Sequence, residues 1–518
     1  MQIIGYNITP EGIFNSRGES RTEPPYLDWL LEQSDAIQIV YDVDYNFSCL
    51  MKLIGLEPYE AKKLLSKGRV YLPPGYTIKY FPEKSFIISL GKWQSAHFSD
   101  AGQYIPGHPV TEKGVEHIAY DVGVSVYQAL TEIGLHPQSL TSPINSYRKE
   151  VMSQLDIPTF HDIPEGPTEY AMNCCKGGWV ECFSKGHYLE TWDYDINSAY
   201  PFFASMLPNL RQGQWVKHRE LTTAKLGFVR ARVKMDAQLH PVMYKTPKRM
   251  NYNPVGEWEE FLTLKQAHFI RDYSLGEVEV IDAWVWLPSE LPRQPLIKAM
   301  YDLYEHKLNS EGIKREVVKR IMVGIYGSFL QWFNMENKPG PFYNPVFGAE
   351  IETNTRLKIA ETCLDHKITP LHVAVDGFLT DKPLALNISP AIGAYKLASH
   401  GPAIVFGTGA VAMTGAIKDF SLDYDDLLSQ LQDNPQAKSL TMKAVKPLTL
   451  GKALQQNKWS QLGEFEETTR SIDLTWDSGR VHRPQVKNAE EFLKTKTTSY
   501  AWDISIIGGV NAPHNEAS

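Results

Sequence analysis

The order of three segments along the chain constrains its fold more than any other feature. In residues 188–201, a strand-like run ends at Asp195 and the chain turns into a helix near Pro201. Residues 297–332 are predicted to be helical, and their cations include Lys307 and three more within residues 314–319. In residues 371–380, two short apolar runs meet at Asp376-Gly377, a sequence that is typical of a tight hairpin turn. This order predicts two strands that bring the aspartates face to face, with a basic helix inserted between them.

Each segment also has an ordinary interpretation. An aspartate followed by Ser198 is common at turns and helix caps, and Asp376 could be a turn residue only. On a helix, Arg315, Lys319 and Tyr326 fall within a sector of roughly 40°, which any amphipathic helix could show. In the functional interpretation, two carboxylates share two metal ions about 3.5–4 Å apart for phosphoryl transfer, and the helix binds a triphosphate. The order is that of the palm, fingers and palm of a polymerase, which favours this interpretation.

Composition sets the broad class of the protein. A chain of 518 residues with 43% hydrophobic and 22% charged residues is typical of a soluble globular protein with three or four domains. It has no apolar run of the roughly 18 residues that span a membrane, and its first residues show no secretory signal. Five cysteines suit a reducing compartment, so a cytoplasmic location is expected. Cys174 and Cys175 have no partner pair at the spacing of a zinc site.

Charge excludes a protein that is basic over its whole surface, because the net charge is −8. One segment differs from the rest of the chain: residues 434–463 contain no acid. They contain five lysines, Lys438, Lys443, Lys446, Lys452 and Lys458. This pattern is either a solvated face or a surface that follows phosphates.

The three segments resemble motifs of family B DNA polymerases, above all the protein-primed branch of bacteriophages and linear plasmids. Residues 195–201 (DINSAYP) are similar to the palm motif D-x-N-S-L-Y-P, and residues 319–327 to the fingers motif K-x-x-x-N-S-x-Y-G. Val375-Asp376 resembles the second half of the D-T-D motif, and residues 175–178 (CKGG) resemble Y-x-G-G, which contacts the template. The resemblance covers about residues 170–395.

The resemblance implies a role for each candidate residue. Asp195 and Asp376 would be the catalytic residues and the ligands of two Mg²⁺ ions, for which Mn²⁺ can substitute. The nucleotide would be bound by Lys307, Arg315, Lys319, Tyr326 and Tyr200, of which Tyr326 packs against the nascent base pair and Tyr200 rejects ribose. DNA would be bound by Lys176, Gly177 and Gly178, and by Lys443, Lys446 and Lys452 of a thumb. The expected partners are primer-template or single-stranded DNA, deoxynucleoside triphosphates and an accessory replication protein, with no membrane.

Several positions depart from the family pattern. Val323 and Gly324 replace the asparagine and serine of the fingers motif, and Ala374 replaces the first aspartate of D-T-D. The K-x-Y motif that follows is matched only poorly by Tyr395-Lys396. Asp195 and Asp376 are retained, so activity is still expected, although these departures could make it weak or unusual.

The amino-terminal region stands where the family has its 3′–5′ exonuclease. Residues 5–8 take the place of the strand with two acids but contain none, and Asn46 stands at a catalytic aspartate's position. Asp121 matches the third exonuclease motif. Under another alignment, Asp42 or Asp44 could take the place of the missing catalytic aspartate. Because one acid cannot hold two metals, we predict an exonuclease-like domain without proofreading.

The predicted fold class is multidomain α/β. An RNase H-like domain (1–165) precedes a palm (166–296), fingers (297–332), the second part of the palm (333–395), and a thumb with the carboxyl-terminal region (396–518). We expect little room for extra subdomains between Tyr200 and Lys307, or between Gly327 and Asp376. The predicted function is a template-directed DNA polymerase of viral or mobile-element origin, with a primase or translesion role, acting in the cytoplasm of a bacterial or host cell. The alternative is an inactive relative that serves as a DNA-binding or assembly subunit.

Overall fold

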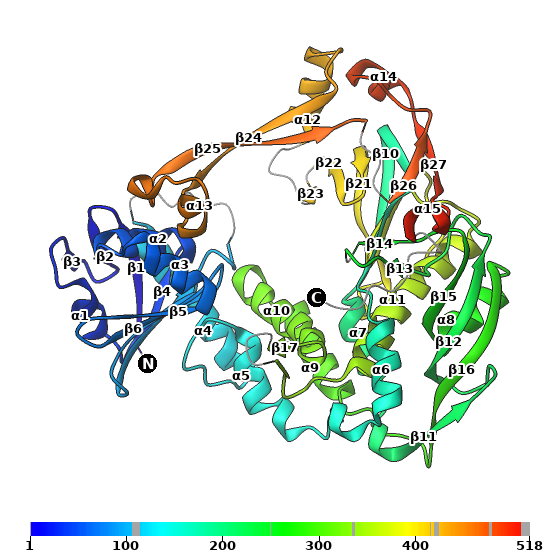
Figure 1. The fold of residues 1–518 in the computed structure, drawn as a ribbon, viewed down its shortest axis with the longest axis horizontal. Coiled ribbons are helices and arrows are strands. Elements are labelled where there is room, and N and C mark those ends of the chain that lie inside the picture. Colours follow the sequence, from blue (N-terminus) through cyan, green and yellow to red (C-terminus); the bar gives the residue numbers. More distant parts are fainter. Residues whose placement is uncertain are drawn as a thin grey trace. The chain divides into compact units, whose positions relative to one another are not determined.

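A computed structural model describes residues 2–105, 114–248, 250–333, 337–414, 416–418, 424–475 and 479–508. The chain forms two compact units (Figure 1). Unit 1 comprises Met1–Gln154, Leu303–Gly324 and Lys443–Thr468, and unit 2 comprises Leu155–Asp302, Ile325–Met442 and Thr469–Ser518.

Unit 1 is built on a mixed sheet of eight strands, in the order β3-β2-β1-β4-β8-β7-β6-β5. Three central strands, β1, β4 and β8, are parallel, and the others pair in antiparallel fashion. The strands are β1 (Ile3–Thr9), β2 (Gly12–Asn15), β3 (Ser20–Arg21), β4 (Ile37–Val40), β5 (Arg69–Leu72), β6 (Tyr76–Phe81), β7 (Ser85–Leu90) and β8 (Gln94–Asp100). This mixed sheet agrees with the α/β fold class predicted for the chain.

The helices of unit 1 pack closely on its sheet, and this packing explains the glycine at position 5. They are α1 (Tyr26–Leu31), α2 (Val43–Leu53), α3 (Pro58–Lys67), α4 (Val115–Glu132) and α5 (Pro143–Glu150), with α13 (Leu450–Gln455) from the later segment. Helix α4 packs so closely on β1 that a Cβ at Gly5 would lie 1.9 Å from the carbonyl oxygen of Glu116. The helical region predicted at 297–332 consists of α9 (Ile297–Leu308) and α10 (Gly312–Phe329).

Unit 2 contains the strands that carry the palm-like motifs. Its main sheet has the order β23-β22-β21-β10-β20-β19-β9, with β27 joined to β10 and β26. The strands are β9 (Trp179–Cys182), β10 (Ser184–Ile196), β19 (His372–Val375), β20 (Gly377–Thr380), β21 (Tyr395–Gly407), β22 (Ala410–Met413), β23 (Ala416–Lys418), β26 (Arg480–Arg483) and β27 (Thr497–Ala501). The predicted hairpin at 369–381 is confirmed as β19–β20. Helices α6 (Glu165–Cys174), α7 (Ala199–Ser205) and α11 (Pro345–Asp365) belong to the same unit.

A second sheet lies in the interval where we expected little room for extra subdomains. Strands β11 (Gly213–His218), β16 (Gly276–Pro288), β12 (Leu226–Met235) and β15 (Gly256–Thr263) form it in that order, and α8 (Leu264–Asp272) packs against it. The expectation of little room between Tyr200 and Lys307 is therefore wrong, because long antiparallel strands fit a subdomain into few residues. Between Gly327 and Asp376, the described residues form α11 and the short pair β17 (Trp332–Phe333) and β18 (Lys338–Pro339).

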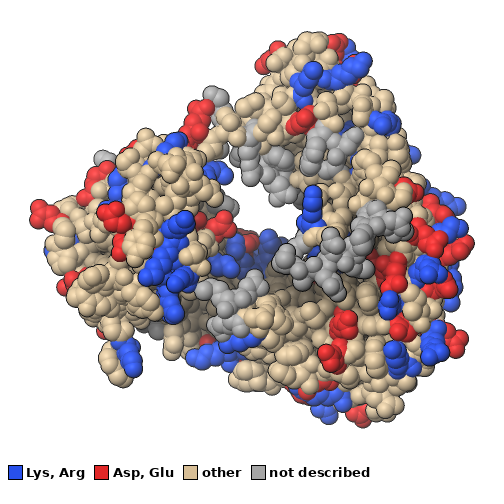
Figure 2. Space-filling model, in the orientation of Figure 1, with Lys and Arg blue, Asp and Glu red and all other residues tan. Residues whose placement is uncertain are grey.

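The outer face of this second sheet carries charge pairs across its strands. Arg230 pairs with Glu259, and Arg232 with Glu257 and Glu279. Figure 2 shows acidic and basic side chains intermingled in this region, where Figure 1 places β12, β15 and β16. This face is balanced in charge and does not form a basic surface.

The carboxyl-terminal region adds α12 (Tyr424–Asp433), the long strands β24 (Ser439–Pro447) and β25 (Phe465–Asp473), α14 (Ala489–Lys494) and α15 (Ile504–Gly508). A further pair, β13 (Tyr244–Lys245) and β14 (Asn251–Tyr252), lies in unit 2. Among the described residues, no helix is long and apolar enough to cross a membrane.

Candidate functional site

The two predicted catalytic aspartates lie at the same end of neighbouring strands. In the β10–β20 pairing, Asp195 is opposite Gly377, and the N–H of Ile196 donates to the carbonyl oxygen of Asp376 at 2.9 Å. The close approach depends on the glycine, since a Cβ at Gly377 would lie 2.8 Å from the carbonyl oxygen of Tyr194. Asp376 is thus a turn residue whose backbone lies next to that of Asp195, and its role as a metal ligand stays a prediction.

Lys396 contacts the first aspartate directly. It lies opposite Asp195 in the β10–β21 pairing, and its Nζ is 2.6 Å from Asp195 Oδ2. The sequence offered only a weak signal for this contact, because Tyr395-Lys396 matched the family motif poorly. The cation balances part of the negative charge at this end of the sheet.

The donor set of this site suits a hard cation. Among the described residues, no three or more His, Cys, Asp or Glu side chains form a group that could hold a metal by themselves. Two carboxylates alone fit Mg²⁺, which commonly binds to one or two protein carboxylates and takes its other ligands from phosphates and water.

The two predicted nucleotide-binding tyrosines lie in contact. The rings of Tyr200, on α7, and Tyr326, near the end of α10, meet edge to face with centroids 4.4 Å apart. Tyr326 donates its hydroxyl hydrogen bond to Glu352 Oε1, on α11, at 2.7 Å. Burial raises the pKa of both phenols, and the charge of Glu352 raises it further, so both hydroxyls remain protonated.

The loop at residues 175–178 is bound to the same glutamate. Glu352 Oε2 accepts the backbone N–H groups of Lys176 (2.8 Å) and Gly177 (2.7 Å). Arg356 donates to the Gly177 carbonyl oxygen and lies 3.5 Å from Glu352. A Cβ at Gly178 would lie 2.8 Å from the side chain of Val375, so this glycine lets the loop approach the hairpin that carries Asp376. Sequence reasoning missed Glu352 and Arg356.

The side chain of Lys176 points into the protein. Its Nζ lies 2.5 Å from Glu260 Oε1 and donates to the Met243 carbonyl oxygen at 2.7 Å. Both side chains of this ion pair are less than one-tenth exposed. Contact between Lys176 and DNA stays a prediction, and the buried ammonium has an internal partner.

Unit 1 carries the other predicted cations. Lys307 Nζ lies 5.5 Å from the ring centroid of Tyr304, and Arg315 lowers the pKa of that tyrosine, although burial raises it by more. Lys319 is mostly exposed and lies 3.5 Å from Glu316. Of the predicted thumb lysines, Lys446 is exposed and Lys452 is partly buried on α13, whereas the side chain of Lys443 lies outside the described residues.

Comparison with known proteins bears on the fold. No family model matches the chain. A curated DNA polymerase from Acidianus bottle-shaped virus is 22% identical in an alignment of 256 residues. The alignment covers 45% of this chain and 37% of that protein, well under two thirds of its length. Phi29 DNA polymerase in a binary complex with primer-template DNA matches with a TM-score of 0.60 and 13% identity, over 91% of this chain and all of that one. Its ternary complex with primer-template DNA and incoming nucleotides matches with a TM-score of 0.60 and 11% identity, over 91% of this chain and 99% of that one.

This chain has the fold of phi29 DNA polymerase. The predicted fold class, an exonuclease-type domain followed by palm, fingers and thumb, is confirmed, and so is the resemblance to the phage branch of family B in its architecture. The boundaries assigned to each domain stay predictions, as do the roles of the site residues.

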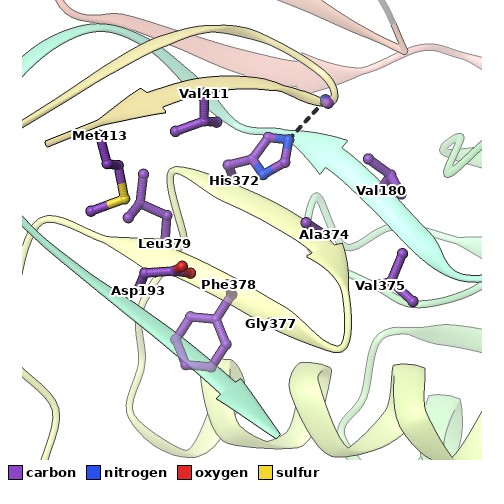
Figure 3. Close-up of a pocket in the computed structure, with 11 residues that line it drawn as sticks. Val180, Asp193, His372, Ala374, Val375, Gly377, Phe378, Leu379, Val411 and Met413 are labelled. Atoms are coloured by element: carbon purple, nitrogen blue, oxygen red, sulfur yellow. Dashed lines mark hydrogen bonds between the residues drawn. The ribbon is translucent and has the colours of Figure 1, made fainter. Parts of the chain in front are cut away.

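Within this phi29-like fold, a small cavity lies beside the catalytic hairpin (Figure 3). Its volume is about 120 Å³, and most of its lining is apolar. Ala374, where the family has an aspartate, borders it, and so does Asp193, which alternation places on the same face of β10 as Asp195. His372 and Gly409 also border the cavity, and His372 Nε2 accepts the N–H of Gly409 at 2.9 Å.

The exonuclease-type part of unit 1 retains three acids near the ends of β4 and β8. Asp100 Oδ1 accepts the N–H groups of Asp42 (3.0 Å) and Gly102 (2.9 Å). Burial raises the pKa of Asp100 to about 7, and the charges of Asp42 and Asp44 contribute. Asp44 Oδ1 accepts the Tyr80 hydroxyl at 2.8 Å.

Asn46 has a structural reason to be an amide. Its Oδ1 accepts the N–H of Ile8 at 2.7 Å, and its Nδ2 donates to the carbonyl oxygens of Tyr41 (2.6 Å) and Asp42 (3.0 Å). An ionised carboxylate can accept but cannot donate, so it could not join β1 to the start of α2 in this way.

Proposed function

We propose that this chain is a template-directed DNA polymerase that extends a primer 3′-hydroxyl with deoxynucleotides. The observation that carries the proposal is the pairing of Asp195 and Asp376 at one end of adjacent strands, within a phi29-like fold. The names of the viral relative and of the matched complexes, which hold primer-template DNA and incoming nucleotides, support the same activity and partners.

In this proposal, Asp195 and Asp376 would hold two Mg²⁺ ions, for which Mn²⁺ can substitute, and the bound ions would supply the Lewis acidity that phosphoryl transfer needs. Lys307, Arg315 and Lys319 bind the triphosphate. Tyr200 and Tyr326 form the side of the pocket that receives the sugar and base.

The same model assigns the DNA contacts. Gly177 and Gly178 allow the template backbone to approach, and Lys446 and Lys452 follow the duplex phosphates. The chain acts in the cytoplasm of an infected or bacterial cell and is encoded by a virus or mobile element.

Primer extension tests this proposal. A labelled primer on a DNA template, with Mg²⁺ and deoxynucleotides, should be extended by the native chain and not by Asp195→Asn or Asp376→Asn. Asp381→Asn is the matched control, because Asp381 is exposed just after β20 and is not part of the proposed site. An unprimed template in the same series tests primase activity, and a template lesion tests translesion synthesis.

The alternative is a DNA-binding subunit without catalysis, which the loss of an acid at Ala374 favours. Salt-sensitive DNA binding with no extension under any condition would support that alternative and reject the polymerase.

We also propose that the exonuclease-type domain does not proofread. The motif strand, β1, has no acid at residues 5–8, and Asn46 is engaged through its amide. A primer with a mismatched 3′ end, incubated with Mg²⁺ and no nucleotides, should remain intact. Excision that Asp42→Asn or Asp44→Asn abolishes would overturn this and assign those acids to catalysis.

A further inference from the structure

Glu352 joins two segments that the proposed polymerase would use for different tasks. It is 2% exposed on α11, yet its two oxygens contact the proposed nucleotide site and the proposed template loop. Oε1 accepts the Tyr326 hydroxyl, and Oε2 accepts two backbone N–H groups of residues 176–177. A buried carboxylate with this many donors has its position fixed, since each broken bond leaves a buried polar group unsatisfied.

The tyrosine that Glu352 binds is also the one that touches Tyr200. The two rings meet edge to face, with centroids 4.4 Å apart. An aromatic contact of this kind is worth about 0.5–1.5 kcal/mol, less than a hydrogen bond to a charged group at about 1.5–3 kcal/mol. The bond to Glu352 therefore does more to fix the Tyr326 ring than its contact with Tyr200 does.

We propose that Glu352 is a positioning residue for sugar selection: it holds the Tyr326 ring against Tyr200 and so keeps Tyr200 where it excludes a ribose 2′-hydroxyl. This inference rests on the proposed polymerase function and extends it. Glu352 does not touch the nucleotide in this scheme and acts only through the Tyr326 hydroxyl.

The chain offers two matched variants for a test. Tyr326→Phe removes the hydroxyl and leaves the ring, while Glu352→Gln keeps the shape and replaces a charge-assisted bond with a neutral one. Glu350→Gln is the control: Glu350 is equally buried on α11, but it pairs with Lys265 at 2.8 Å and Asn354 rather than with the site.

The measurement is the ratio of kcat/KM for a deoxynucleotide to that for the matching ribonucleotide, with thermal unfolding measured in parallel. Tyr326→Phe should lower the ratio about tenfold, which corresponds to the lower end of the energies of hydrogen bonds to charged groups. Glu352→Gln should lower it about threefold, because a neutral bond remains. The double variant should resemble Tyr326→Phe alone, because both changes act on one bond. Glu350→Gln should leave the ratio unchanged even if it lowers the unfolding temperature.

The outcomes separate this inference from the function on which it rests. Absence of deoxynucleotide extension by the native chain would reject the polymerase itself. Normal extension with an unchanged ratio in Tyr326→Phe would reject the role of Glu352. The role would also be rejected if the double variant lowered the ratio by the product of the two single effects. If Glu352→Gln does not fold, Tyr326→Phe still decides.

Discussion

Lys176 provides the sharpest contrast between the sequence and the structure. The family resemblance of residues 175–178 implies that Lys176 contacts DNA, whereas the structure buries its ammonium 2.5 Å from Glu260. The carboxylate of Glu260 also accepts the N–H groups of Phe261 (2.9 Å) and Trp258 Nε1 (3.2 Å), so it cannot turn toward water. Lys176→Met would therefore leave a buried charge without its cation.

The expected loss is about 3–5 kcal/mol in the free energy of unfolding, the usual penalty for removing one partner of a buried ion pair. Removing both charges in Lys176→Met/Glu260→Gln should recover most of that loss, because the remaining groups are neutral. Urea unfolding of the single and double variants measures both values.

DNA binding by the double variant then decides the role of Lys176. A lysine that neutralises one duplex phosphate contributes about 0.9 to the slope of log K against log salt concentration. We expect no change in this slope for the double variant, and a decrease for Lys446→Ala, whose lysine is exposed. A slope that falls by about one unit in a well-folded double variant would refute this reasoning, as would a loss below about 1 kcal/mol in Lys176→Met.

Three further variants test the charge balance of the fold. Burial, with a contribution from Arg480, lowers the pKa of His240 from 6.5 to about 3, so its neutral form stabilises the fold above pH 6.5 and this stability is lost on acidification. The native chain should lose about 2 kcal/mol between pH 7 and pH 5 in urea unfolding that His240→Gln does not lose. Because the pKa of Asp100 is raised to about 7, its charged form weakens the fold as the pH rises through 7. Asp100→Asn should raise the unfolding temperature at pH 8 and lose this advantage as the pH falls toward 4. Asn46→Asp should destabilise unit 1 by about 1–3 kcal/mol in thermal unfolding without restoring 3′ excision, because it removes the donor to Tyr41 and leaves β1 without an acid.

The sequence could predict the pairing of the two aspartates because both signals are local. Apolar alternation indicates strands, and Asp-Gly indicates a tight turn, so Asp376 had to lie at the tip of a hairpin. The helices at 297–332 were predictable for the same reason, since their periodicity lies within one segment. The order of the segments indicated palm, fingers and palm, and the family resemblance then implied the rest of the fold class.

The contacts of Glu352 and Lys396 could not be predicted in this way. Glu352 meets Lys176 and Tyr326 only after α11 has packed against two other segments, and no local pattern records that packing. Lys396 reaches Asp195 through the register of β10 against β21, which is irregular at two points. The second sheet was missed because its strands were read as part of the palm and not as a separate layer.

The departures from the family motifs have different physical causes, and this bears on activity. Gly324 stands where α10 crosses Ile144, and a Cβ there would lie 2.8 Å from that side chain, so packing explains the absence of a serine. Asn46 is explained by the hydrogen bonds that its amide donates. Ala374 borders a cavity, and nothing in the structure requires a small residue at that position. Two of these changes therefore follow from the architecture and say little about catalysis. The third change, Ala374, leaves the site without the acid that the family has two residues before Asp376. The rate of the proposed polymerase therefore depends on how well Asp195 and Asp376 bind metal ions without that acid.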